Sequence, residues 1–246
     1  MAGVTPNLPA PAPSGPIRRA PRQTGPVEAE DVRLAVYRAF VETGRPPSAG
    51  ELGHSLGCPV AEVTRLLAEL HAARHIVLDT NGRDVVMAHP FSAVPLGFSV
   101  MGATTLWWGG CAWDSFALPH VVPGDDEVVV ATTCPACSTA HAWLVDAASP
   151  PPGDQLAHFL VPAAHMWDDV VHTCAHQRLF CGEECIAAWL ERTGNPEGDV
   201  LDLATLWRLA SRWYEGRLER GYVRREPTAA REYFAEVGLR GSFWGL

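Results

Sequence analysis

Residues 127–145 read EVVVATTCPACSTAHAWLV, and the prediction of the fold starts from this stretch. Two runs rich in β-branched and aromatic side chains, 127–132 and 142–145, flank a short turn that contains Cys134 and Cys137. Such side chains favour strands, and a short connection between two such runs is typical of an antiparallel hairpin. The stretch therefore predicts two neighbouring strands with a pair of cysteines at their turn.

The residues around this hairpin extend the same prediction. A third β-rich run lies at 158–161, and helical patterns follow at 184–192, 202–218 and 228–237. A mixture of short strands and separate helices indicates the α+β class. Residues 91–246 are therefore predicted to form a mixed α/β domain with a small antiparallel sheet and a C-terminal helical extension.

Residues 28–90 show a different pattern, with apolar side chains at helical spacing in three places and then a hairpin. Ser48 and Glu51 have the spacing of a capping box at the start of the second helix, and Gly57 follows its end. An Asn-Gly pair at 81–82 separates two short β-rich runs, which is a strong hairpin signal. Three helices with a two-stranded wing predict a domain that resembles a winged helix-turn-helix.

Charge and composition exclude several classes of protein. The formal net charge of −9 argues against a protein that coats nucleic acid. Residues 28–90 contain six arginines against nine acidic residues, so a structural or lid-like role is expected for them rather than DNA binding. Residues 1–27 are rich in proline and are predicted to be a flexible tail. Because neither a membrane span nor a secretory signal is apparent, a cytoplasmic location is expected.

The chain has seven cysteines, which in a reducing compartment predict thiolate chemistry or metal binding rather than disulfides. The pairs Cys134-x-x-Cys137 and Cys181-x-x-x-Cys185 match the spacing of a structural zinc site with four cysteine ligands. The alternative is a set of free thiols. A thiol oxidoreductase that uses the first pair is disfavoured, because the reductase motif opens a helix and a strand-like run follows here.

Cys111 and Asp114 form a second candidate site. A thiol and a carboxylate three residues apart share one face if the segment opens a helix, and a helix N-terminus lowers the pKa of a thiol. Burial against Trp107, Trp108 or Trp113 is expected to raise the pKa of Asp114 towards neutrality. The alternative is that Cys111 is a small core residue and Asp114 a helix cap.

Two stretches resemble those of a known family. The segment 110–114, GCAWD, looks like the first catalytic stretch of the organomercurial (alkylmercury) lyase family, and the segment 174–180, CAHQRLF, is similar to its second cysteine stretch. Cys134 falls where that family carries a further, non-catalytic cysteine. The resemblance spans roughly residues 30–215 and includes the order of a small winged-helix-like domain before a mixed domain. Departures from the family pattern are Cys137, Cys181, Cys185 and the C-terminal extension.

The resemblance implies a function in mercury detoxification. It implies that Cys111 and Cys174 hold mercury together with Asp114, and that Asp114 takes a proton from a cysteine and passes it to the leaving carbon. The implied substrate is a small organomercurial, no cofactor is required for catalysis, and small thiols or a mercuric reductase accept Hg(II). The alternative is a non-catalytic protein that binds or senses zinc or another soft metal, with a winged-helix domain that reads DNA.

Overall fold

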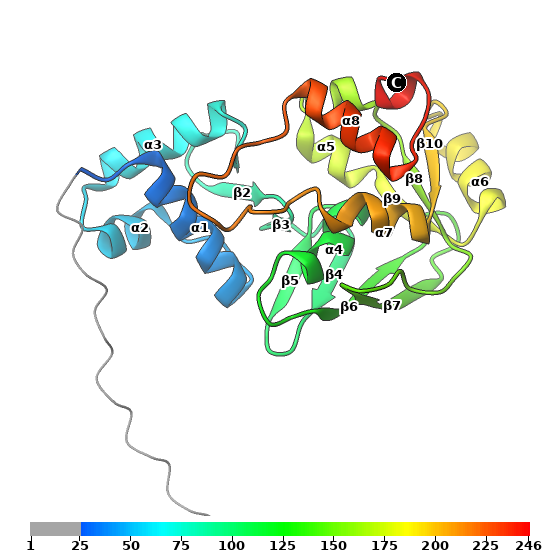
Figure 1. The fold of residues 1–246 in the computed structure, drawn as a ribbon, viewed down its shortest axis with the longest axis horizontal. Coiled ribbons are helices and arrows are strands. Elements are labelled where there is room, and N and C mark those ends of the chain that lie inside the picture. The colour runs from blue at the N-terminus through cyan, green and yellow to red at the C-terminus, as the bar shows by residue number, and fades with distance from the viewer. Residues whose placement is uncertain (1–25) are drawn as a thin grey trace, which may run out of the picture.

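The computed structural model describes residues 26–246, which form a mixed α+β fold with two antiparallel sheets (Figure 1). Three helices lie at one end, the larger sheet lies in the middle, and most helices of the C-terminal half lie around the smaller sheet. This agrees with the predicted class. Of the predicted tail, residues 1–25 lie outside the described residues. Within residues 26–246, no helix has both the length and the apolar character needed to cross a bilayer.

The three helices predicted for the N-terminal region are confirmed. They are α1 (Ala29–Thr43), α2 (Ala49–Leu56) and α3 (Val60–Ala72). At the start of α2, the backbone N–H of Glu51 donates to Ser48 Oγ at 3.2 Å, and the Glu51 carboxylate accepts the Ser48 N–H at 2.7 Å. Gly57 ends α2 with a φ of 70°, a left-handed conformation that glycine adopts without steric cost.

The larger sheet begins with the hairpin predicted from the Asn-Gly pair. Its strands are β1 (Val77–Leu78) and β2 (Val85–Ala88), which pair in antiparallel fashion. In the turn between them, Asp79 Oδ1 accepts the backbone N–H groups of Arg83 and Asp84 at 2.7 and 3.1 Å. The turn therefore satisfies its own backbone donors, as short aspartate side chains commonly allow.

The sheet continues beyond the predicted domain boundary at residue 90. Its strand order is β1-β2-β3-β5-β4-β6-β7. The remaining strands are β3 (Phe91–Ser92), β4 (Phe98–Met101), β5 (Leu106–Gly109), β6 (Glu127–Thr133) and β7 (Ala140–Asp146). The boundary separates β2 from β3, although these two strands are hydrogen-bonded neighbours. The winged-helix assignment stays a prediction, and the N-terminal helices share one core with the rest of the chain.

Strands β6 and β7 confirm the hairpin predicted from residues 127–145. Along β6, Val128 and Val130 are buried whereas Glu127 and Val129 are exposed, because successive side chains point to opposite faces of a sheet. The third predicted strand, at 158–161, has the expected length but begins two residues earlier, since β8 ends at Phe159. The smaller sheet has the order β10-β8-β9. Its strands are β8 (Leu156–Phe159), β9 (Gln177–Phe180) and β10 (Asp199–Asp202).

Eight helical segments complete the chain after β5. They are α4 (Ala112–Ala117), η1 (Leu118–His120), η2 (Ala163–His165), α5 (Val170–Ala175), α6 (Glu183–Thr193), α7 (Leu203–Ser211), α8 (Pro227–Val237) and η3 (Ser242–Trp244). The helix predicted over 202–218 was wrong at its C-terminal end. Arg212 leaves the helical conformation with a φ of −125°, and Gly216 is left-handed with a φ of 72°. A helix cannot continue through such residues.

Residues 212–226, here called the connector, join α7 to α8 by way of the N-terminal helices (Figure 1). The buried guanidinium of Arg33 on α1 donates to the carbonyl oxygens of Arg217 and Glu219, each at 2.6 Å. The N–H of Gly221 donates to the Glu30 carboxylate at 2.8 Å. The connector is therefore held by α1, although it lies almost two hundred residues away in the chain.

Candidate active site

Cys111 and Asp114 lie where β5 runs into α4. Cys111 is the N-cap of α4, and its Sγ accepts the backbone N–H of Asp114 at 3.4 Å. This agrees with the prediction that the segment opens a helix. Gly110 allows the Asp114 carboxylate to lie close to the backbone, because a Cβ at residue 110 would collide with that carboxylate. The thiol and the carboxyl are both buried, at 2 % and 1 % exposure.

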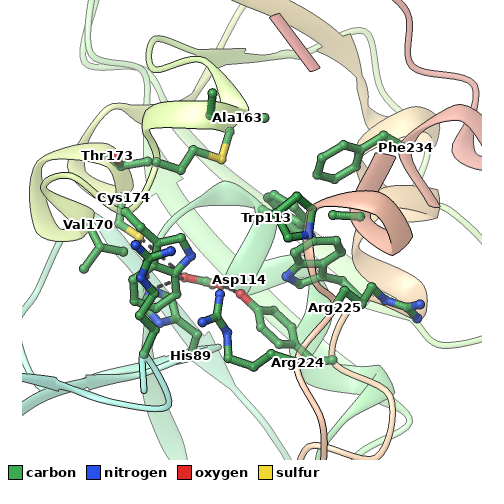
Figure 2. A pocket seen from close by; sticks show the side chains of 18 of the residues that line it. His89, Trp113, Asp114, Ala163, Val170, Thr173, Cys174, Arg224, Arg225 and Phe234 are labelled. Atoms are coloured by element: carbon green, nitrogen blue, oxygen red, sulfur yellow. Dashed lines mark hydrogen bonds and ion pairs between the residues drawn. The ribbon is translucent and has the colours of Figure 1, made fainter. Parts of the chain in front are cut away.

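Cys174 reaches the same place from the other side of the fold. It lies on α5, and its Sγ is 3.9 Å from Asp114 Oδ2 and 3.5 Å from His89 Nε2 (Figure 2). His89 Nε2 and Asp114 Oδ2 are 4.0 Å apart, so one atom from each of these three residues lies within a small sphere. The Cys111 and Cys174 thiols are close enough to influence each other's pKa. Segments remote in sequence therefore converge on one buried point.

These residues line a cavity of about 360 Å³. Trp113 and Trp167 contribute apolar walls, and Phe234 of α8 lies across from Cys174 (Figure 2). A cavity of this size has room for a small organic molecule. It is both partly enclosed and lined by reactive side chains, which is the usual arrangement of a catalytic site.

Asp114 is the strongest acid–base candidate in the cavity. Burial raises the pKa of its carboxyl to about 7, in spite of hydrogen bonds and nearby charge that lower it. Among the groups that lower it, the Tyr214 hydroxyl donates to Oδ1 at 2.5 Å, and Cys111 and Arg217 act in the same direction. A carboxyl with this pKa can both accept and donate a proton near neutral pH.

Trp107, Trp108 and Trp113 were the alternative candidates for the side chain that shields Asp114. Trp113 lines the cavity, whereas the indole N–H of Trp107 donates to the carbonyl of Phe40 at 2.8 Å. Trp108 points towards solvent with 37 % exposure. Trp107 and Trp108 are successive residues of β5 and point to opposite faces of the sheet, so they cannot both face the acid.

The pKa values of the Cys111 and Cys174 thiols are raised, whereas a helix N-terminus alone would lower the pKa of a thiol. Burial raises the pKa of Cys111 well above its ordinary value, and the nearby Cys174 thiol and Asp114 raise it further. The backbone N–H of Asp114 lowers it, but by less. For Cys174, the contact with Cys111 lowers the pKa, whereas burial and Asp114 raise it, and the net direction is upward. Both residues are therefore thiols at neutral pH, and a base must remove their protons before they bind a metal.

His89 is a site residue that the sequence reasoning missed. Burial lowers the pKa of its imidazole to about 3, with Arg217 and Arg224 acting in the same direction, so the ring is neutral. Its carbonyl accepts the Tyr37 hydroxyl and Arg217 Nε, each at 3.2 Å, which fixes the backbone. His89 follows β2 in the predicted N-terminal region, and a single histidine there gave no sequence signal.

Tyr214 and Arg217 were also missed, because both lie in a segment predicted to be helical. Arg217 is 3 % exposed, and its guanidinium lies 5.5 Å from the ring centre of Tyr214 and 4.7 Å from that of Tyr222. Within residues 26–246 it forms no ion pair, so aromatic faces and one carbonyl stabilise its charge. The connector thus supplies the cavity with a hydroxyl and a cation that local sequence patterns do not reveal.

The other four predicted metal ligands form a separate cluster. Cys134 and Cys137 lie at the β6–β7 turn, and Cys181 and Cys185 lie at the start of α6. One sulfur from each lies within 4.8 Å of all the others. Cys174 belongs to the cavity and is not part of this group. The structure therefore divides six of the seven cysteines into two clusters.

Comparisons with known proteins identify the family. A protein-family model described as alkylmercury lyase matches residues 91–215, about half of the 246-residue chain. No curated protein matches the chain. Among solved structures, the mercury-bound form of MerB2 is similar, with a TM-score of 0.59 and 15 % sequence identity. The match covers 80 % of this chain and 94 % of that one, and at this identity it shows the shared fold. The family match confirms the predicted family, and the chain belongs to the alkylmercury lyases.

Proposed function

We propose that this alkylmercury lyase cleaves the carbon–mercury bond by protonolysis, with Cys111 and Cys174 binding mercury and Asp114 moving the proton. The observation that carries the proposal is the meeting of two buried thiols with a carboxyl whose pKa is about 7. Thiolates are the natural ligands of a soft ion such as mercury. A carboxyl with a near-neutral pKa is the natural partner for a proton that must be taken up and given back.

Binding of the substrate is the first step. The substrate carries an organic group R and an exchangeable ligand X on mercury. One cysteine thiol displaces X, so that a sulfur–mercury bond forms, the mercury–X bond breaks, and the thiol proton leaves with X. The Asp114 carboxylate then removes the proton of the second thiol, which also binds mercury. Its Oδ2 lies 3.9 Å from Cys174 Sγ, a distance that small side-chain movements can shorten.

Cleavage of the carbon–mercury bond follows. Two thiolates donate electron density to mercury and raise the negative character of the attached carbon. Protonated Asp114 gives its proton to that carbon, the electron pair of the carbon–mercury bond forms the new carbon–hydrogen bond, and R–H leaves. Hg(II) stays bound to two thiolates. Of the two thiol protons, one has left with X and the other is in the hydrocarbon, so the step is balanced.

The remaining polar groups support this proton path. Neutral His89 lies 3.5 Å from Cys174 Sγ, where it orients the thiol without adding positive charge to a mercury site. Tyr214 holds Asp114 by its Oδ1 and leaves Oδ2 directed towards Cys174. We further propose that small thiols or a mercuric reductase remove Hg(II), because the two protein thiolates must be freed before the next turnover.

The test is a product assay on the full chain. Hydrocarbon release from methylmercury and phenylmercury is measured with excess small thiol for the wild type and for Cys111→Ser and Cys174→Ser. Each variant is expected to lose activity by at least about a hundredfold, because a hydroxyl is a hard ligand that binds mercury weakly. Cys58→Ser is the matched control, since Cys58 belongs to neither cysteine cluster. Substantial turnover by either active-site variant would remove that cysteine from the mechanism.

A further inference from the structure

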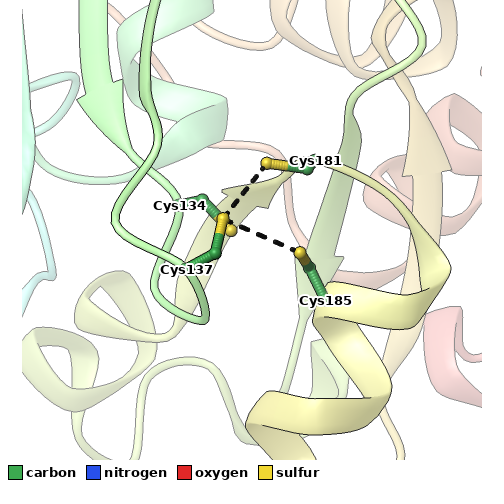
Figure 3. Close-up of side chains that lie close together, drawn as sticks. All are labelled: Cys134, Cys137, Cys181 and Cys185. Carbon is green, nitrogen blue, oxygen red and sulfur yellow. Dashed lines mark hydrogen bonds between the residues drawn. The ribbon is translucent and has the colours of Figure 1, made fainter.

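The cluster of Cys134, Cys137, Cys181 and Cys185 has a shape that the lyase reaction does not explain. Cys137 Sγ lies 3.5 Å from Cys181 Sγ and 3.8 Å from Cys185 Sγ, and Cys134 Sγ lies beside them (Figure 3). All four sulfurs are within 4.8 Å of one another. Four sulfurs from two distant segments, 44 or more residues apart, therefore surround one point.

These separations match one metal ion held by four thiolates. Zinc–sulfur bonds of about 2.3 Å put the corners of a regular tetrahedron about 3.8 Å apart. A disulfide would require sulfurs about 2.05 Å apart, and none of the cysteines in the described residues is paired in this way. Four thiolates in a closed tetrahedral arrangement suit zinc, whereas a substrate site keeps part of the coordination open.

The backbone around the sulfurs is arranged for the same purpose. The N–H of Ser138 donates to the Cys134 carbonyl at 2.9 Å, and the N–H of Cys185 donates to the Gly182 carbonyl at 3.1 Å. Each cysteine pair therefore lies on its own tight turn. Arg192 of α6 donates to the carbonyls of Pro135 and Ala136 at 2.6 and 3.3 Å. This guanidinium joins the two turns and supplies positive charge beside a site that would carry a net negative charge with four thiolates.

The region around the cluster has only a small apolar core of its own. A small apolar core, separate from the main one, contains Cys134 itself and four other buried side chains: Leu160, Phe180, Ile186 and Trp189. Small cores commonly depend on a metal or a disulfide for their stability. The cluster joins the β6–β7 turn of the larger sheet to the end of β9 in the smaller sheet. It therefore lies at the junction of the two sheets.

We infer that Cys134, Cys137, Cys181 and Cys185 bind one structural Zn²⁺ ion that cross-links the two sheets. Cys111 and Asp114 lie on α4 after β5 of the larger sheet, whereas Cys174 precedes β9 of the smaller one. Only six residues separate Cys174 from Cys181. The zinc ion would thus hold the two halves of the mercury site in register without touching substrate. This inference does not depend on the proposed mechanism.

Metal analysis of the purified full chain tests the inference. Zinc and iron are measured per chain by mass spectrometry for the wild type, Cys137→Ser, Cys185→Ser, Cys111→Ser and Cys58→Ser. We expect about one zinc per chain in the wild type and in the last two variants, as a closed four-cysteine site holds a single ion. The Cys137 and Cys185 variants should lose most of it. Either of these two variants would also lose zinc if it failed to fold. A second measurement therefore uses the wild-type chain alone.

For that purpose zinc in the wild-type chain is replaced with Co²⁺, and its absorption is recorded. Tetrahedral coordination by four thiolates gives intense sulfur-to-cobalt charge-transfer bands and visible bands typical of a tetrahedral ion, and this is the expected spectrum. Less than about a tenth of a zinc per chain together with no such cobalt spectrum would overturn the inference. Iron in place of zinc would overturn the choice of metal. Loss of zinc in Cys111→Ser but not in Cys137→Ser would assign the ion to the cavity instead and would equally contradict it.

Discussion

The two cysteine clusters place the same side chain in different surroundings. In the cavity, two buried thiols lie beside a carboxyl and a neutral imidazole, so a mercury ion bound by both thiols can keep its organic group. At the sheet junction, four sulfurs surround one point and leave no position open. Structural metal sites are closed and catalytic ones stay open. The difference shows that the number and spacing of thiols, and the presence of an acid beside them, decide what a cysteine cluster can do.

The largest effect is expected from Asp114→Asn, a variant that distinguishes mercury binding from proton transfer inside the cavity. Asp114→Asn keeps the shape of the side chain but cannot carry a proton. We expect it to retain mercury on one cysteine, because the first sulfur–mercury bond forms without Asp114, and to lose about 10²- to 10⁴-fold in hydrocarbon release, the usual contribution of a general acid or base. Binding is measured by competition with a thiol chelator, and release by gas chromatography. A parallel loss of both would make Asp114 a structural residue.

A second prediction concerns the pH dependence of stability, which should originate in the buried carboxyl of Asp114. The carboxyl of Asp114 has a pKa of about 7 in the folded chain, against an ordinary value of 3.8 for an exposed aspartate. The folded state therefore holds the proton of Asp114 more tightly than the unfolded state does. The protonated carboxyl stabilises the fold fully below pH 3.8, and this stabilisation is lost as pH rises through about 7. Over that window the loss is on the order of 4 kcal/mol.

The measurement compares the free energies of unfolding of the wild type and Asp114→Asn in urea between pH 5 and pH 8. The stability of the variant relative to the wild type should increase with pH, and most of the increase should fall below pH 7. Both proteins contain the same four-cysteine cluster, so any effect of pH on that cluster cancels in the difference. A difference in stability that stays constant with pH would contradict the raised pKa of Asp114.

The smallest effect is expected from the hydrogen bond between Tyr214 and Asp114. This bond lowers the pKa of the carboxyl, so Tyr214→Phe should raise it. The limb of the pH–rate profile that reports ionised Asp114 should move to higher pH, by about one pH unit or less. Tyr233→Phe is the matched control, because its hydroxyl donates to the carbonyl of Leu209 at 2.9 Å and lies outside the mercury site. An unchanged profile for Tyr214→Phe would exclude this role.

Local features of the fold were predictable because they depend on short-range physics. The capping box of Ser48 and Glu51, the hairpin at the Asn-Gly pair and the alternation along β6 all follow from residues a few positions apart. The turn at 134–139 and the helix start at Cys111 were predictable for the same reason. The helix over 202–218 was predicted too long, because apolar spacing does not reveal that Arg212 leaves the helical conformation.

The sequence by itself determined several of the helices and strands, the two cysteine spacings and the family, since these are carried by neighbouring residues and by motifs. Only the tertiary structure decided that the sheet continues across residue 90 and that His89, Tyr214 and Arg217 join Asp114. These residues come from a strand end and from a connector that crosses to α1, and nothing in their local sequence marks them. Long-range packing decides which side chains share a buried cavity, and burial in turn sets the pKa values on which the proposed chemistry depends.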